Sequence, residues 1–387
     1  MTFSRTTGRH ATLVAVSYSV LAVLPLFLVS AQAVQLQRDL DFGTAGLGLA
    51  VSVCFAVSAV AATPLGHLVA RIGARTGLKV SAAMALAALV LMTFFADRWW
   101  HVAFALALCG LANATAQVAT NVVLAGDVPE SRQGIAFGAK QAAIPIASLT
   151  AGLALPIVGL LAGWRFAFAG AAVVVVVALV FQPRVSGGRR SRAARAGRPS
   201  ALLLTIALVG ICAGAVANAI PAFAVDSAVA SGFGEGAAGL LLAVGSLAAV
   251  VVRVGAGWVA DRRGSIGFSE LLWLTGAGAV ALVGLALAGE NHAFYVLATL
   301  AVFATGWGWP GLIHYATVRS HRDAPAAASG FVLSWVYVGN VIGPAIVGFV
   351  AEHRSYGEAW AYGAGVLALA AVATWAARRL ALVQAPA

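Results

Sequence analysis

Long apolar stretches recur along the whole length of this chain of 387 residues. Each reaches about 20 residues or more, which is enough to cross the hydrocarbon core of a bilayer as a helix. Only 10% of the residues are charged, whereas soluble domains carry about 25%. Backbone polar groups must be satisfied internally in hydrocarbon, and the period-2 alternation of a membrane β-barrel is absent. The sequence therefore predicts an all-α membrane protein.

The apolar stretches predict twelve transmembrane helices in two pseudo-symmetric halves of six. A segment rich in Arg, Gly and Ser, 183–200, lacks hydrophobic periodicity and is interpreted as a linker. It separates an N-terminal half, 1–182, from a C-terminal half, 201–387. The expected spans are 11–36, 45–70, 78–96, 101–125, 133–160, 164–182, 200–226, 237–260, 269–289, 293–318, 326–351 and 358–378.

Two motifs occur once in each predicted half. The segment Gly66–Gly73, with sequence GHLVARIG, is matched by Gly257–Gly264, with sequence GWVADRRG. Likewise, Asp127–Pro129 is matched by Asp323–Pro325. In both cases the second copy follows the first by roughly half of the chain, and an internal repeat of this kind in an apolar chain is typical of transporters.

Positive charge is distributed unevenly over the predicted loops. Most of the 24 lysine and arginine residues fall on the side that holds both termini and the linker. The positive-inside rule places both termini in the cytoplasm and predicts a multi-pass protein of a bacterial inner (cytoplasmic) membrane. The net charge of +11 is accordingly attributed to topology and to contact with the lipid bilayer, not to nucleic-acid binding. Neither the cysteines nor the scattered histidines show the spacing of a metal site.

Two six-helix halves, a basic central loop and a Gly-x-aliphatic-x-Asp-Arg-x-Gly segment together resemble the major facilitator superfamily. The segment after the eighth span matches well, whereas after the second span Ala70 stands where the family has aspartate. The resemblance implies that these loops lock the halves together when the cytoplasmic side is closed; the alternative is that they only hold the topology. The implied gating residues are Gly66, Arg71, Gly73, Arg75, Gly257, Asp261, Arg262 and Gly264.

The same resemblance implies a mechanism of alternating access. A small-molecule substrate would bind between the halves near the middle of the membrane, and rocking of the halves would expose it to each side in turn. No nucleotide-binding loop of the Gly-x-x-x-x-Gly-Lys type is present, so ATP is not expected to drive transport. We expect a monomer without a cofactor that uses a coupling proton or counter-ion.

Two basic residues fall inside predicted spans, Lys140 in the fifth and Arg253 in the eighth. Each lies roughly 10 Å from the cytoplasmic end, at about 1.5 Å per residue. An ionisable group at such a depth is costly unless it is paired or hydrated. No carboxylate is expected at a comparable depth, because Asp226 and Glu270 fall at the ends of spans. The two cations are interpreted as a site for an anionic solute, with snorkelling toward the headgroups as the alternative.

Further residues in the spans are candidates for the same site. Asn113, Gln117 and Asn121 recur every four residues and form a stripe on one helix face, for which helix–helix hydrogen bonding is the alternative. The glycines and the proline of Gly306–Gly311 predict a flexible or broken helix, and His314 is interpreted as a helix-end residue. The candidate substrate-binding residues are Lys140, Arg253, Asn113, Gln117, Gln141, Tyr18, Asn218, Trp307, Trp309 and Tyr337.

The segment Gly138–Gln141, followed by Pro145, resembles the cyanate/nitroimidazole-type branch of the family, whose members carry a Lys-Gln pair in helix 5. The rival is a multidrug/proton antiporter that exports lipophilic compounds. In that group an arginine lies four residues before the glycine that corresponds to Gly110, but Leu106 stands there in this chain. The sequence therefore predicts a secondary active transporter of a small organic anion, not an enzyme, with proton symport left open.

Overall fold

The computed structural model describes residues 3–182, 199–263, 265–321 and 325–384. These ranges fold into helices joined by short turns, without any strand. Most of the linker predicted at 183–200 lies outside the described residues. The helices are α1 Phe3–Ala31, α2 Ala33–Leu40, α3 Thr44–Ile72, α4 Ala74–Phe94, α5 Trp99–Asp127, α6 Glu130–Gln141, α7 Ala143–Ala154, η1 Leu155–Gly159, α8 Leu160–Ala162, α9 Trp164–Val180, α10 Ala201–Ala217, α11 Ala219–Ala230, α12 Glu235–Arg263, α13 Phe268–Leu287, α14 His292–Ala301, η2 Val302–Gly306, α15 Pro310–Ser320, α16 Pro325–His353 and α17 Tyr356–Gln384.

Among the described residues, 11 helical segments are long and apolar enough to cross a membrane, and the shorter apolar helix α9 is a further candidate. Their positions agree with the predicted spans, so the all-α prediction is confirmed. The ends differ by a few residues because turn geometry also sets them. For example, Gly73 and Gly163 stand between successive helices with φ of 86° and 98°, a conformation that favours glycine.

Several spans are interrupted. The first is broken at Gln32 between α1 and α2, the fifth at Ala142 between α6 and α7, and the seventh at Asn218 between α10 and α11. The tenth contains the π-helical turn η2, followed by a turn that ends where α15 begins at Pro310. The break predicted within Gly306–Gly311 is therefore confirmed. A π-helical turn disturbs the regular backbone hydrogen bonds and frequently occurs at functional sites.

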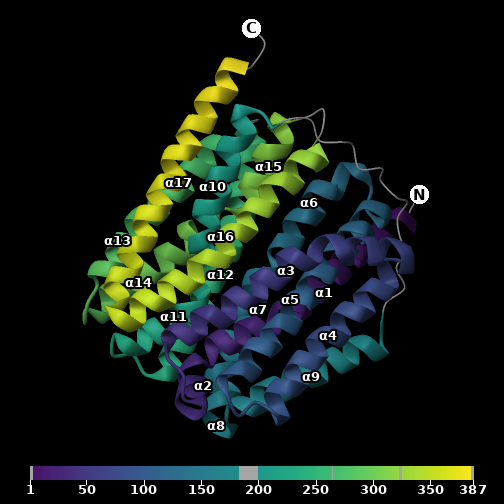
Figure 1. The fold of residues 1–387 in the computed structure, drawn as a ribbon. Helices are drawn as coiled ribbons and strands as arrows, with labels where there is room; N and C mark the ends of the chain where they lie inside the picture. The colour runs from purple at the N-terminus through teal and green to yellow at the C-terminus, as the bar shows by residue number, and fades with distance from the viewer. Residues whose placement is uncertain (1–2, 183–198, 264, 322–324, 385–387) are drawn as a thin grey trace.

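The helices form two bundles that lean against each other (Figure 1). We call α1–α9 the N-terminal half and α10–α17 the C-terminal half. Along the seam between them, α3 packs on α16 and α7 packs on α12. A Cβ atom on Gly48 of α3 would lie 2.3 Å from the carbonyl oxygen of Pro344 in α16, and one on Gly152 of α7 would lie 2.7 Å from that of Gly239 in α12. The seam therefore depends on small residues, as helix packing in membranes commonly does.

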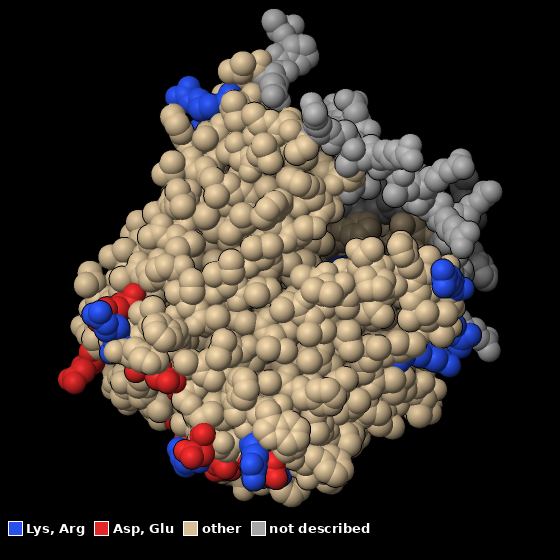
Figure 2. Space-filling view, in the orientation of Figure 1, with Lys and Arg blue, Asp and Glu red and all other residues tan. Residues whose placement is uncertain are grey.

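Both ends of the chain lie at the same end of the bundles, called here the terminal end, and the opposite end is the distal end (Figure 1). Figure 2 shows the surface hollowed between the halves at the terminal end, whereas the halves meet toward the distal end. Basic and acidic residues gather at the two ends, and the belt between them is uncharged in this view. Large apolar side chains such as Phe166, Trp273 and Val372 are exposed, as expected for a surface in contact with lipid.

Candidate functional site

Lys140 lies in the last turn of α6 and is almost completely buried, with 5% of its surface exposed. Its Nζ atom donates hydrogen bonds to Oδ1 of Asn121, at 2.5 Å, and to the backbone carbonyl of Gln117, at 3.3 Å. Both acceptors belong to α5, so this lysine is held within the N-terminal half. Neither acceptor carries a charge, so neither forms an ion pair with the Lys140 amino group inside the bundle.

Arg253 of α12 is 9% exposed and connects the two halves. Its Nε and Nη2 atoms donate to the carbonyl oxygen of Trp307, at 3.1 and 2.9 Å, within the C-terminal half. Its Nη1 atom donates to the carbonyl oxygen of Gln141, at 2.8 Å, in the N-terminal half. The guanidinium also lies 5.0 Å from the centre of the Trp307 ring. Arg253 therefore reaches across the seam and binds the residue that follows Lys140 in the sequence.

The helix breaks make these carbonyls available. Gln141 is the last residue of α6, and its carbonyl would be bonded in a regular helix by the backbone nitrogen of residue 145. That residue is Pro145, which has no N–H. Trp307 lies in the turn between η2 and α15. Two interrupted helices thus supply the acceptors that the buried guanidinium requires.

No carboxylate neutralises this pair of cations within the described part of the chain. The four ion pairs found there involve Arg38, Asp97, Arg263 and Arg354 with their partners, and none includes Lys140 or Arg253. The alternative of snorkelling requires the charged groups to reach toward the headgroups. Instead, both side chains donate to groups inside the bundle. The site therefore holds two basic side chains without an acidic partner among the described residues.

The polar stripe of α5 continues this site away from Lys140. Gln117 Nε2 donates to Asn113 Oδ1 at 3.4 Å, and Asn113 Nδ2 donates to Ser58 Oγ of α3 at 3.3 Å. From the C-terminal half, the Tyr337 hydroxyl of α16 approaches Asn113. Nearby on α16, Asn340 Oδ1 is buried without a hydrogen-bond partner among the described residues. The stripe predicted on one helix face thus forms a chain of polar side chains.

Trp307 and Trp309 are each 1% exposed, so neither packs against lipid. The Trp307 ring meets Phe27 of α1 edge to face, at 6.1 Å between ring centres. This contact crosses the seam and closes the space beside Arg253 with aromatic groups. The indole nitrogen of Trp309 is buried and has no hydrogen-bond partner in the described part of the structure.

Three predicted residues contribute differently from what the sequence suggested. Tyr18 is directed away from the seam, because its hydroxyl donates to the Ala178 carbonyl of α9 at 2.9 Å. Gln141 contributes its backbone carbonyl to Arg253. Asn218 is half-buried at the junction of α10 and α11. By contrast His314, interpreted as a helix-end residue, lies inside α15 close enough to interact with Lys140 across the seam.

The gating role predicted for the repeated loop motif stays a prediction. Arg71 and Arg75 are exposed, and Gly66 and Gly73 belong to α3 and the turn after it. In the second copy Gly257 lies in α12, and the Arg262 guanidinium stacks 4.0 Å from the centre of the Trp258 ring. The side chain of Asp261 and the whole of Gly264 lie outside the described residues.

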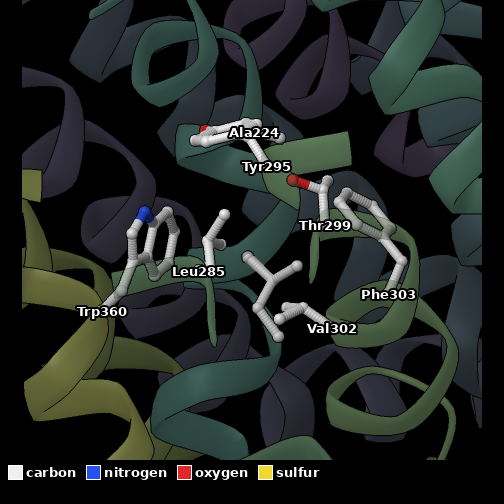
Figure 3. A pocket seen from close by; sticks show the side chains of 8 residues that line it. Ala224, Leu285, Tyr295, Thr299, Val302, Phe303 and Trp360 are labelled. Carbon is white, nitrogen blue, oxygen red and sulfur yellow. The ribbon is translucent and has the colours of Figure 1, made fainter. Parts of the chain in front are cut away.

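Two further hollows are unsuited to be the central solute site. A small pocket inside the C-terminal half, lined by Tyr295, Thr299 and Trp360 among others, holds about 10 Å³ (Figure 3). That volume fits about one water molecule. A shallow groove of about 320 Å³ at the distal end, bordered by Arg38 and Glu235, opens to the surface. Neither of them contains Lys140 or Arg253.

Comparison with known proteins agrees with the geometry. Residues 11–291 match the profile of the Major Facilitator Superfamily. The chain belongs to this family. The family comprises transporters and not enzymes, and its members bind small-molecule substrates. No curated protein matches the chain.

Solved structures with this fold are similar over nearly their full length. A bacterial homologue of the human lysosomal transporter Spinster, inward-facing and occupied, has a TM-score of 0.75 at 14% identity, with 98% of this chain and 99% of that chain covered. A D-xylose–proton symporter has a TM-score of 0.77 at 15% identity, covering 94% and 96%. The xylose transporter XylE from E. coli, in a partially occluded inward-open conformation, has a TM-score of 0.78 at 14% identity, covering 96% and 99%. At these identities the likeness concerns the fold.

Proposed function

We propose that this protein is a secondary active transporter that moves a small organic anion across the membrane by alternating access. The observation that carries the proposal is the uncompensated pair of buried cations, one from each half, joined across the seam by the hydrogen bond from Arg253 to Gln141. The halves are the two units that rock, divided at the linker. The resemblance of Gly138–Gln141 to the cyanate/nitroimidazole-type branch points to the same solute class.

The proposed chemistry is an exchange of acceptors at Arg253. A guanidinium has five N–H donors, and the three bonds to Trp307 and Gln141 leave donors for another acceptor. A carboxylate could bind it bidentately, and Lys140 would add a second positive charge. Because the Gln141 bond crosses the seam, a solute that replaces it would change how tightly the halves are held. Binding and rocking would thereby be coupled.

The hollow at the terminal end corresponds, in this proposal, to a state open toward the cytoplasm. Both termini then lie on the cytoplasmic side of a bacterial inner membrane, as the distribution of positive charge predicts. The protein works as a monomer, and a proton or counter-ion drives it. A multidrug/proton antiporter is the competing function, and the test below separates the two.

The test is the melting temperature of the detergent-purified protein against small carboxylates, inorganic anions and lipophilic cations, because a ligand that binds the folded state raises it. We expect an anion to raise the melting temperature. Arg253→Ala and Lys140→Ala should each weaken the binding of that anion about 10- to 150-fold, as expected for the loss of charge-assisted hydrogen bonds of about 1.5–3 kcal/mol. The exposed Arg98 and Lys79 provide matched controls, and Arg98→Ala and Lys79→Ala should bind like the wild type.

Counterflow of the same labelled anion into proteoliposomes then tests movement rather than binding. Stabilisation by lipophilic cations alone, unaffected by either substitution, would replace the anion proposal with drug export. An anion that binds equally well to wild type and to Arg253→Ala would show that the buried cations do not form its site.

A further inference from the structure

The hydrogen bonds described between the halves at the distal end all run in the same direction, from donors of the N-terminal half to acceptors of the C-terminal half. The acceptors are carboxylates of the C-terminal half, and the donors lie on a short segment of the N-terminal half, 35–45. Glu235 of α12 accepts from Arg38 Nη2 at 2.8 Å and from Gln35 Nε2 at 3.2 Å. Glu352 of α16 accepts from the backbone nitrogen of Ala45 at 2.7 Å. These bonds hold the distal end closed in this structure.

Asp226 of α11 is the most enclosed of these carboxylates, with 9% of its surface exposed. All of its donors are neutral groups. A single oxygen, Oδ2, accepts from Gln37 Nε2 at 3.0 Å, from Thr44 Oγ1 at 3.1 Å and from the Tyr356 hydroxyl at 2.6 Å. Gln37 and Thr44 belong to the N-terminal half, whereas Tyr356 belongs to the C-terminal half. Separation of the halves at this end would therefore remove two of the three donors at once.

The C-terminal side of this contact is rigidly supported. Ser227, next to Asp226, is buried and bonds the Tyr295 hydroxyl at 2.8 Å and the Trp360 indole nitrogen at 2.9 Å. Tyr295 and Trp360 both line the small pocket seen in Figure 3. The Tyr356 ring stacks on Trp360, with 6.2 Å between ring centres. Asp226 thus stays fixed to α14 and α17, and the movable partners are those from α2 and α3.

The charge of Asp226 has no cationic partner among the described residues. The nearest basic side chain of α2, Arg38, pairs with Glu235 instead. The ionisable groups that face Asp226 are the hydroxyls of Tyr356 and Tyr295, and the other carboxylates that accept hydrogen bonds across the seam at this end are Glu235 and Glu352. None of these groups neutralises it. The charged form is therefore stabilised by the three donated hydrogen bonds alone, and such bonds favour the ionised carboxylate.

We propose that Asp226 is a proton-binding site, and that a proton taken up from the distal side opens the distal end. The sign follows from the contacts: the closed end offers three donors to the ionised carboxylate, whereas the opened end leaves it with one in a largely apolar helix. Opening therefore favours the protonated form, and by reciprocity protonation favours opening. The inference rests on the proposed alternating access and adds the residue that senses the proton.

The test is a distance measurement between spin labels across the distal end. Arg98→Cys and Glu290→Cys place one label on an exposed loop of each half, and the native Cys54, Cys109 and Cys212 are buried. As the pH falls from about 8 to about 5, we expect the long-distance population to grow severalfold. In Asp226→Asn, which carries no charge, we expect that population already at the higher pH and no further response.

Two more variants keep the test decisive. Tyr356→Phe removes one donor without changing the charge, so the transition should move to higher pH. Glu358→Gln removes a carboxylate at the same end that pairs within its own half with Arg354, and it should titrate like the wild type. The proposal would be overturned by a wild-type distance distribution that does not change with pH. A wild-type pH response in Asp226→Asn, or an unshifted transition in Tyr356→Phe, would overturn it too. No solute is present, so failure to bind an anion would leave this result unaffected.

Discussion

The two buried cations differ in what they require from their surroundings. Lys140 is a compact charge that is satisfied by one amide oxygen and one carbonyl of a single helix. Arg253 has a planar fork that reaches two carbonyls in different halves at the same time. Of the hydrogen bonds described for these two cations, only one from the arginine crosses the seam, and this bond changes when the seam moves.

This difference predicts the outcome of exchanging the arginine for lysine. Arg253→Lys keeps the positive charge, but one ammonium cannot replace the three bonds of the guanidinium to Trp307 and Gln141. We expect it to bind the anion at least tenfold more weakly, about 1.4 kcal/mol, while retaining the wild-type melting temperature within a few degrees. Titration of the anion by thermal shift measures both; wild-type affinity would mean that charge alone suffices.

At the scale of the residue, the sequence predicted where the charged residues lie in the spans better than it predicted their hydrogen-bond partners. Lys140 and Arg253 stood out because hydropathy locates the spans and a charge within a span is rare. Their bonds to Gln141 and Trp307 were not predictable, since they depend on which carbonyls a broken helix leaves open. Tyr18 was a candidate for the central site, but its hydroxyl contacts α9, because one residue does not define the orientation of an apolar helix. Asp226 was placed correctly near a span end, but its donors are distant in sequence.

At the scale of the helix, the interruption of the fifth span shapes the candidate site. Hydropathy alone predicts one continuous helix there, and the structure divides it into α6 and α7. Pro145 was noted in the sequence for its resemblance to a family branch, but its consequence is local: it frees the Gln141 carbonyl that Arg253 binds. The breaks at Ala142 and Asn218 each lie three residues before a proline, Pro145 and Pro221. A proline therefore accompanies these two breaks, although Pro64 lies inside the continuous helix α3.

Replacing Pro145 should change the melting temperature and the affinity for the anion in opposite directions. Pro145→Ala restores an N–H that competes with Arg253 for the Gln141 carbonyl and adds a backbone hydrogen bond that joins α6 to α7. We therefore expect a higher melting temperature together with weaker anion binding. Pro64→Ala is the matched control, because Pro64 is exposed inside the continuous helix α3. It should raise the melting temperature and leave binding unchanged. Unaltered anion binding in Pro145→Ala would mean that the break in the fifth span does not contribute to the site.

At the scale of the whole molecule, the two helix pairs of the seam and the distal hydrogen bonds join the halves in the same region. Close packing of α3 on α16 and of α7 on α12 brings the halves together where Arg38 and Glu235 also pair. The terminal end has no comparable set of bonds between described residues of the two halves. In the proposed alternating access the structure is one of two arrangements, and we expect the balance between them to depend on how well small residues fit at the seam.

A single methyl group at the seam should shift that balance. In Gly152→Ala the new Cβ would meet the Gly239 carbonyl oxygen at 2.7 Å and the Ala243 nitrogen at 2.8 Å, both across the seam near the distal end. Overpacking of this kind costs about 1–3 kcal/mol, which moves a two-state equilibrium about 5- to 150-fold. Labels at Arg98→Cys and Glu290→Cys should then show a larger long-distance population at neutral pH. Gly170→Ala in α9, where a Cβ meets nothing within 4 Å, should not. A lower melting temperature with an unchanged distance would mean that α7 absorbs the clash, and that the seam does not set the balance between the two arrangements.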